Sequence, residues 1–237
     1  MHSAFKRLII GIVIITLSIT TSYAKPYEVH EVRYNNLGAF KGYLCKPPGK
    51  GPFPTVIYSY DEFIDWAGSY VAKKRGYNLK QIAKDFAKKG YAVFIPIERF
   101  RKVQSVLGAV EYMSKKPYVN KRRMHLMGVS EGAFINLIVL ENTDKIRSSV
   151  CIAPIGINDK GYLSTNNLKA AKNKQTKILF LEAKDVGWRI NSQAKVYHAI
   201  SKQYPNLYHK AYYVKKRWFW FHHHPFMKDV HEFFRKQ

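Results

Sequence analysis

The pentapeptide Gly128-Val129-Ser130-Glu131-Gly132 joins two apolar runs and carries a serine at its centre. The first run starts at Arg123 and the second ends at Leu140, so the segment is typical of a strand, a sharp turn and a helix. Glycines on both sides of such a turn remove Cβ atoms that would clash with the strand and the helix. Ser130 is therefore our candidate nucleophile.

Histidines are the side chains that most often activate a serine hydroxyl, because a neutral imidazole can accept its proton during attack. The chain has three consecutive histidines, His222, His223 and His224, shortly before its final predicted helix. Adjacent imidazoles also bind metals, but no cluster of Cys, His or Asp accompanies them in the sequence. We predict neither a metal nor a cofactor, and we interpret His125 and His231 as ordinary strand and helix residues.

The elements that must position these residues alternate along the chain. Near-continuous apolar strands separated by amphipathic helices are typical of a mainly parallel sheet covered on both faces. The first two strands flank the turn signal Asn35-Asn36-Leu37-Gly38 and should form an antiparallel hairpin. The expected strands are 29–34, 40–45, 55–60, 91–97, 123–129, 149–155, 178–183 and 208–214, and the expected helices are 78–89, 103–113, 131–140 and segments starting near Leu163, Asn191 and residue 225.

The first 24 residues are typical of an export signal. Lys6 and Arg7 precede an apolar run, and Ser22 and Ala24 provide small residues where a signal peptidase reads. The apolar run is shorter than the roughly 20 residues that span a bilayer, which favours a cleaved signal over an anchor. We predict cleavage after Ala24 and a periplasmic or secreted protein.

Residues 25–237 are long enough for one domain with a full core and short for two. The formal charge of +24 is spread along the chain, without a recognisable nucleic-acid-binding motif. A solvated basic surface explains this charge, and contact with an anionic lipid or envelope surface is the alternative partner. We expect no nucleic-acid partner. Cys45 and Cys151 could pair in an oxidising compartment, but we expect two buried free thiols.

The chain resembles the α/β-hydrolases, and among them the dienelactone-hydrolase-like branch that is also similar to prolyl-oligopeptidase catalytic domains. The resemblance covers essentially the whole of residues 25–237. It rests on the hairpin start, on Gly51-Pro-Phe-Pro-Thr-Val-Ile, on Asp85-Phe-Ala-Lys-Lys-Gly-Tyr-Ala-Val and on the serine pentapeptide. It implies an α/β-hydrolase fold and the residue order serine, acid, histidine.

That order assigns the remaining catalytic roles. Asp185 ends the strand that begins at Lys177, about where the family has its acid, and Glu182 inside that strand is a fallback. His224-Pro225-Phe226 is similar to the family's histidine turn, so His224 is the first choice of base and His223 the alternative. Asp185 would hold the imidazole in the tautomer that accepts the proton of Ser130.

The resemblance also implies an oxyanion hole made of the Glu131 N–H and a second main-chain N–H near Tyr60 or Asp61. Many relatives have a histidine-glycine pair where this chain has Tyr60-Asp61. The acidic side chains of Asp61 and Glu131 would place negative charge near a developing anion. This departure either slows the reaction or favours a substrate with a cationic group.

Two aromatic-rich stretches should approach the rim of such a site: a loop covering 62–70, and 218–221. They suggest an apolar acyl or aryl pocket, or a lipid-contacting surface, although core packing would explain them equally well. We predict an exported serine hydrolase of small-molecule carboxylic esters. A peptidase of the same fold and a non-catalytic basic binding protein on this scaffold are the alternatives; oligomeric state is not predicted.

Overall fold

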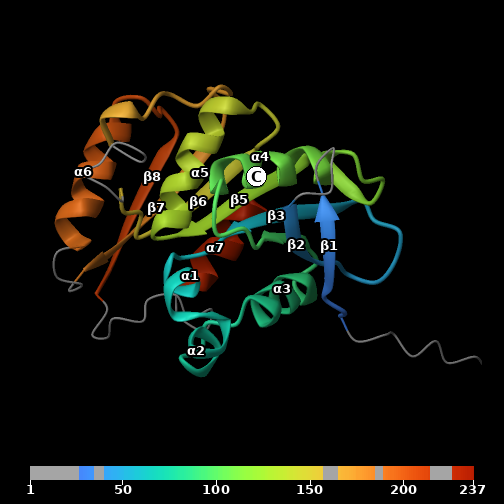
Figure 1. Ribbon diagram of the computed structural model, residues 1–237. Helices are drawn as coiled ribbons and strands as arrows, with labels where there is room; N and C mark the ends of the chain where they lie inside the picture. The colour runs from blue at the N-terminus through green and yellow to red at the C-terminus, as the bar shows by residue number, and fades with distance from the viewer. Residues whose placement is uncertain (1–26, 35–39, 157–164, 185–188, 214–225) are drawn as a thin grey trace, which may run out of the picture.

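One eight-stranded sheet forms the centre of the computed structural model, which describes residues 27–34, 40–156, 165–184, 189–213 and 226–237 (Figure 1). The strand order is β1-β2-β4-β3-β5-β6-β7-β8. The pairs β1–β2 and β2–β4 are antiparallel, and all the other pairs are parallel. The strands are β1 (His30–Tyr34), β2 (Phe40–Cys45), β3 (Phe53–Ser59), β4 (Ala92–Pro96), β5 (Val119–Val129), β6 (Ser148–Ile152), β7 (Lys177–Lys184) and β8 (Leu207–Tyr213).

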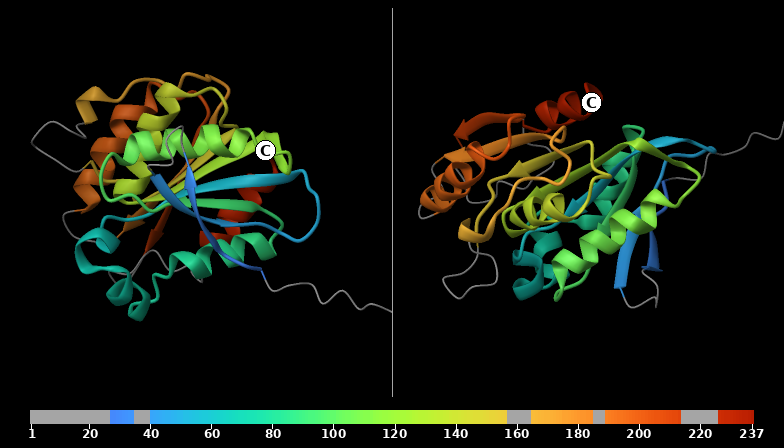
Figure 2. Two further views of the ribbon diagram at one scale, coloured as in Figure 1. Left: turned by 45° about the vertical axis from the view of Figure 1, so that its right-hand side comes forward. Right: turned by 90° about the horizontal axis from the view of Figure 1, so that it is seen from above.

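Helices cover both faces of this sheet (Figures 1 and 2). One face carries α1 (Phe63–Ala67), α2 (Ser69–Lys74), α3 (Leu79–Lys88) and α7 (Phe226–Arg235). The other carries α4 (Lys102–Ser114), α5 (Glu131–Asn142) and α6 (Arg189–Ser201). The predicted fold class, a mainly parallel sheet between helical layers with an antiparallel start, is confirmed.

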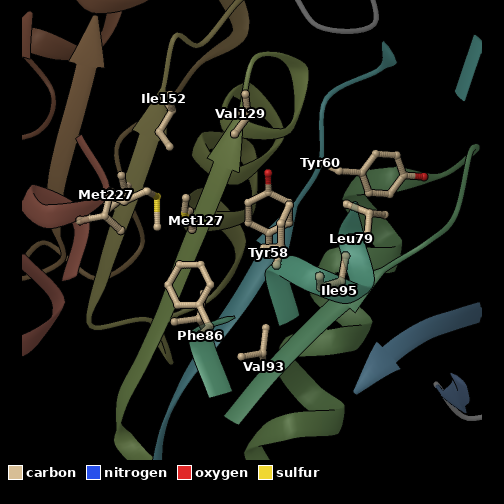
Figure 3. Packing of buried hydrophobic residues seen from close by; sticks show 14 of the residues in the cluster. Tyr58, Tyr60, Leu79, Phe86, Val93, Ile95, Met127, Val129, Ile152 and Met227 are labelled. Atoms are coloured by element: carbon tan, nitrogen blue, oxygen red, sulfur yellow. The ribbon is translucent and has the colours of Figure 1, made fainter. Parts of the chain in front are cut away.

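Strand residues alternate between two separate cores, because successive side chains point to opposite faces of a sheet. Val56 and Tyr58 pack against α3 and α7, whereas Ile57 packs on the opposite face. Figure 3 shows part of the first core, where Phe86 of α3 lies beside the side chains of the central strands. The cysteines follow the same division: Cys45 belongs to the first core and Cys151 to the second, and both are buried free thiols, as expected.

Most predicted elements agree with the structure to within a few residues. The helix expected over 78–89 is α3, which Asn78 caps by accepting the Gln81 N–H at 3.3 Å, and Gly90 with a φ of 92° follows its end. The turn predicted at residues 35–38 and the signal segment lie outside the described residues. Within the described ranges, no helix has the length and apolar character needed to cross a membrane.

Two local predictions were wrong. The stretch after Asp61 was expected to be a loop, but it forms α1 and α2, separated by Gly68 with a φ of 83°. The helix expected from Leu163 is replaced, in the described part from residue 165, by a short 3-10 turn, Thr165–Asn167. Beyond that turn, the N–H groups of Lys169 and Lys172 donate to residues at the end of α5 instead of forming helical hydrogen bonds.

Candidate active site

Ser130 lies on the sharp turn between β5 and α5, as predicted. Its backbone has a φ of 56° and a ψ of −120°, a conformation that is costly for a residue with a side chain. Its N–H donates to the Ile152 carbonyl of β6 at 2.9 Å, and its carbonyl accepts the Ala133 N–H at 3.1 Å. These bonds connect the turn to the neighbouring strand and to the first turn of α5, and so hold the strained conformation in place.

The two flanking glycines are required by space. A Cβ atom on Gly128 would lie 2.5 Å from the Gly132 carbonyl oxygen. A Cβ atom on Gly132 would lie 2.2 Å from the Ser59 carbonyl oxygen and 2.6 Å from that of Tyr60. These contacts are with main-chain atoms, which cannot move aside cheaply. The absence of Cβ atoms therefore lets α5 begin directly against the end of β3.

Ser130 is buried, with 1% of the residue exposed, and its hydroxyl has a carboxylate partner that the sequence did not predict. Its Oγ donates to Oε2 of Glu62 at 3.1 Å. Glu62 directly precedes α1, which places its side chain over the elbow. The only sequence signal was its position in the segment after β3, and this was insufficient because α1 itself was not predicted. In this arrangement the serine proton is directed toward a carboxylate.

Glu131 is paired with a lysine that it shares with Asp65. Nζ of Lys102, at the start of α4, pairs with the Glu131 carboxylate and with that of Asp65 at 2.5 Å. Burial alone would lower the pKa of Lys102, but the two carboxylates outweigh it and the net shift is upward, so the lysine stays charged. Burial raises the pKa of Glu131, an effect that Lys102 opposes. Lys102 therefore offsets only part of the negative charge expected from Glu131, because Asp65 shares its single positive charge and Glu62 and Asp65 also raise the pKa of Glu131.

Tyr60 and Asp61, the candidates for the second oxyanion donor, lie at the exit of β3 beside the first turn of α5. The N–H of Asp61 donates to the Tyr77 hydroxyl at 2.9 Å, and its carboxylate accepts the Phe63 N–H at 2.7 Å at the start of α1. The Tyr60 side chain extends toward α1, where its hydroxyl donates to Asp65 at 3.0 Å. The Asp61 amide is thus occupied, which favours Tyr60 as the second donor.

The predicted acid and bases, Asp185, His223 and His224, lie outside the described residues. The strands that lead to them are described: β7 pairs with β6, whose Ile152 carbonyl accepts the Ser130 N–H. The fallback acid Glu182 is bound to Lys184 Nζ at 2.7 Å and to His209 Nε2 at 3.0 Å. These contacts hold its carboxylate at the β7–β8 pair.

The two histidines interpreted as strand and helix residues lie in β5 and α7. His125 in β5 is fully buried, and its Nδ1 lies 2.8 Å from Ser148 Oγ. Burial, with smaller effects from Arg123 and Arg147, lowers its pKa to about 3. His231 in α7 packs against Phe86 and Tyr91, and burial lowers its pKa as well. Across the described ranges, no three His, Cys, Asp or Glu side chains form a cluster that could hold a metal ion.

Comparisons with known proteins show which sequences and which folds this chain is similar to. Residues 106–214 match the family model described as "BAAT / Acyl-CoA thioester hydrolase C terminal". No curated protein sequence matches the chain. These two comparisons concern the amino-acid sequence, whereas the comparison with solved structures concerns the fold.

Three solved structures illustrate that similarity. An esterase from the fungus Rhizomucor miehei is 9% identical, with a TM-score of 0.65 over 91% of this chain and 84% of the esterase. A Klebsiella pneumoniae protein described as a dienelactone hydrolase is 15% identical, with a TM-score of 0.60 over 86% of this chain and 89% of its own. Dipeptidyl peptidase 4 of Porphyromonas gingivalis is 14% identical, with a TM-score of 0.62 over 90% of this chain but only 35% of the peptidase.

Proposed function

We propose, from the premise that this chain is an α/β-hydrolase in fold, that it is a serine hydrolase of carboxylic esters. The backbone of Ser130 is the observation that carries the proposal. A positive φ at a serine between two sterically required glycines, at the end of a central parallel strand, is costly to maintain. Such a turn has a known use, which is to present a nucleophile beside a helix N-terminus.

The proposed reaction proceeds through an acyl-enzyme. Ser130 Oγ attacks the ester carbonyl carbon while His224, or alternatively His223, accepts the hydroxyl proton, and Asp185 orients the imidazole. The N–H groups of Glu131 and Tyr60 stabilise the oxyanion, and each such donor typically contributes a few kcal/mol. The alcohol leaves with the proton from the imidazole, and water then hydrolyses the acyl-enzyme by the same steps.

Glu62 adds a requirement to this scheme. Its hydrogen bond with Ser130 Oγ must be broken, or the carboxylate must move, before the hydroxyl can donate to an imidazole. In our proposal, a substrate that enters the site breaks this hydrogen bond, because it displaces the Glu62 carboxylate from the space in front of the Ser130 hydroxyl. In the structure described here, Ser130 is therefore in a resting arrangement.

The alternatives use the same scaffold. A peptidase is the second candidate, favoured by the similarity to a dipeptidyl peptidase, although this chain corresponds to only about a third of that protein. A non-catalytic binding protein is the third, and the buried Ser130, whose hydroxyl is bound to Glu62, is the observation in its favour.

We also propose export through the segment 1–24. The net charge of +24 supports contact with an anionic envelope surface, and the exposed side chains of Trp66, Tyr70 and Phe100 offer apolar contacts to a lipid surface.

A fluorophosphonate probe tests the main proposal. The wild-type protein should be labelled and should hydrolyse short-chain aryl esters, and Ser130→Ala should abolish both activities while leaving the fold intact by circular dichroism. Hydrolysis of aminoacyl anilides in place of esters would favour the peptidase. A folded wild type that is neither labelled nor active would refute the catalytic proposal.

A further inference from the structure

A large pocket opens beside the candidate active site, between α2, the first turn of α3 and the segment after β4. Its volume is about 760 Å³, within the range of small-molecule sites. Four tyrosines contribute to its wall, together with aliphatic side chains that include Leu79 and Ile97: Tyr43, Tyr60, Tyr70 and Tyr77. Figure 3 shows Tyr60 and Leu79 on the side of the core where this pocket lies. The pocket therefore offers aromatic and apolar surface to a ligand.

The charged side chains of the wall are mostly cationic. Lys73 comes from α2, Lys80 and Lys84 from successive turns of α3, and Arg99 from the segment after β4. Among the described residues, none of these four has a carboxylate within salt-bridge distance. Asp65 is the one acidic side chain among the described residues of the wall, and Lys102 pairs with it. The pocket thus has an excess of uncompensated positive charge.

The first turn of α3 adds to this potential. Asn78, Leu79, Lys80 and Gln81 all line the pocket, so the N-terminus of a ten-residue helix faces it. The positive end of the helix dipole favours an anion there, and the first turn carries no acidic residue. The cations of the wall and the N-terminus of α3 therefore both favour binding of an anion.

Tyr60 and Tyr77 stay uncharged and do not offset the cations. Burial, followed by the charge of Asp65, raises the pKa of Tyr60, and burial raises that of Tyr77 well above its ordinary value. Both hydroxyls therefore keep their protons at neutral pH. Lys80 Nζ lies 5.0 Å from the centre of the Tyr43 ring, which places a cation beside aromatic surface within reach of one ligand.

We propose that this pocket binds a carboxylate-bearing compound with an aromatic or apolar body. The body would lie against the tyrosines, and the carboxylate would be held by Lys80, Lys84 and the N-terminus of α3. The pocket adjoins the elbow through Tyr60, whose carbonyl lies against Gly132. As an extension that rests on the proposed function, the anion would be part of the ester substrate. This charge preference is opposite to the cationic one that Asp61 and Glu131 suggested from sequence.

Direct binding tests the pocket without reference to catalysis. Isothermal titration should show that the wild-type protein binds 2-naphthoate at least tenfold more tightly than the uncharged 2-naphthamide. The double variant Lys80→Gln/Lys84→Gln should reduce this preference to less than threefold. Lys88→Gln/Lys89→Gln removes the same charge from the other end of α3, outside the pocket, and should keep the preference.

A second substitution, on α2, guards against a folding defect in the first variant. Lys73→Gln should weaken naphthoate binding, and Lys121→Gln, an exposed residue of β5 that does not line the pocket, should leave it unchanged. Equal affinity for naphthoate and naphthamide would overturn the proposal. Equal losses in the pocket and control variants would overturn it too, because they would indicate attraction by the whole surface.

A pair of esters separates this proposal from that of the hydrolase. The substrate extension predicts a higher kcat/KM for 4-acetoxybenzoate than for its methyl ester, and the Lys80→Gln/Lys84→Gln variant should remove the difference. Naphthoate binding by a folded protein that neither hydrolyses these esters nor reacts with the fluorophosphonate would leave the pocket established and refute the hydrolase. Equal hydrolysis of both esters without naphthoate binding would refute the pocket and leave the hydrolase standing.

Discussion

Replacing Glu62 by glutamine should make Ser130 more reactive. The substitution keeps the size of the side chain and its ability to accept a hydrogen bond, but it removes the charge that lies 3.1 Å from Ser130 Oγ. Hydrogen bonds to charged groups stabilise by about 1.5–3 kcal/mol, and neutral ones by about 0.5–1.5 kcal/mol. The resting contact should therefore weaken by about 1.4 kcal/mol, which corresponds to roughly a tenfold faster reaction of the serine.

The assay is the second-order rate of fluorophosphonate labelling, measured for the wild type, Glu62→Gln and Glu111→Gln. Glu111 is exposed on α4 and pairs with Lys145, so its substitution changes the net charge equally without touching the elbow. We expect a roughly tenfold increase for Glu62→Gln alone. A clear decrease would refute the reasoning, because it would mean that the Glu62 carboxylate assists the attack of Ser130 instead of restraining it.

Three further predictions concern stability, and urea denaturation measures each. Gly132→Ala places a Cβ atom 2.2 Å from a main-chain oxygen and should cost at least about 3 kcal/mol, whereas Gly108→Ala in α4, where the nearest atom lies at 3.4 Å, should be neutral or stabilising; similar effects at both sites would contradict the steric argument. Lys102→Met leaves the largely buried carboxylates of Asp65 and Glu131 without their cation and should lower the free energy of unfolding by about 3 kcal/mol, part of which an added Glu131→Gln should restore. An unchanged free energy of unfolding in the single variant would show that these carboxylates are not buried in solution. The pKa of His125 falls from 6.5 in the unfolded chain to about 3 in the folded protein, so between these pH values the unfolded state binds more protons. The stability that is fully present above pH 6.5 should therefore be lost as pH falls, by up to about 1.4 kcal/mol per pH unit. His125→Gln should reduce this slope between about pH 6 and 5, and an unchanged slope would mean that the histidine is not buried.

The fold and the candidate nucleophile were predictable because both depend on neighbouring residues. Apolar runs of strand length, separated by helical periodicity, indicated a parallel sheet with two covered faces, since such strands are buried on both sides. The two glycines around Ser130 likewise report a local requirement, which the structure explains by contacts shorter than 2.7 Å to any added Cβ atom. The buried positions of Cys45 and Cys151 followed from the same apolar pattern.

Short elements without a long periodic pattern were not predictable in the same way. α1 and α2 have five and six residues, too few to show a helical period, and the packing of Phe63 and Ala72 against the sheet stabilises them. The chain after Thr165 is held by hydrogen bonds to the end of α5, which no local pattern encodes.

The surroundings of the nucleophile were decided only by tertiary structure. Glu62 and Ser130 are 68 positions apart, and Lys102 pairs with acidic residues from two other elements. The cations of the pocket likewise converge from α2, α3 and the segment after β4. Periodicity specifies which face of an element is buried, but the distances between side chains on different elements depend on how those elements pack. The sequence by itself therefore determined the sheet, its layers and the serine turn, and tertiary packing determined which charges surround that serine.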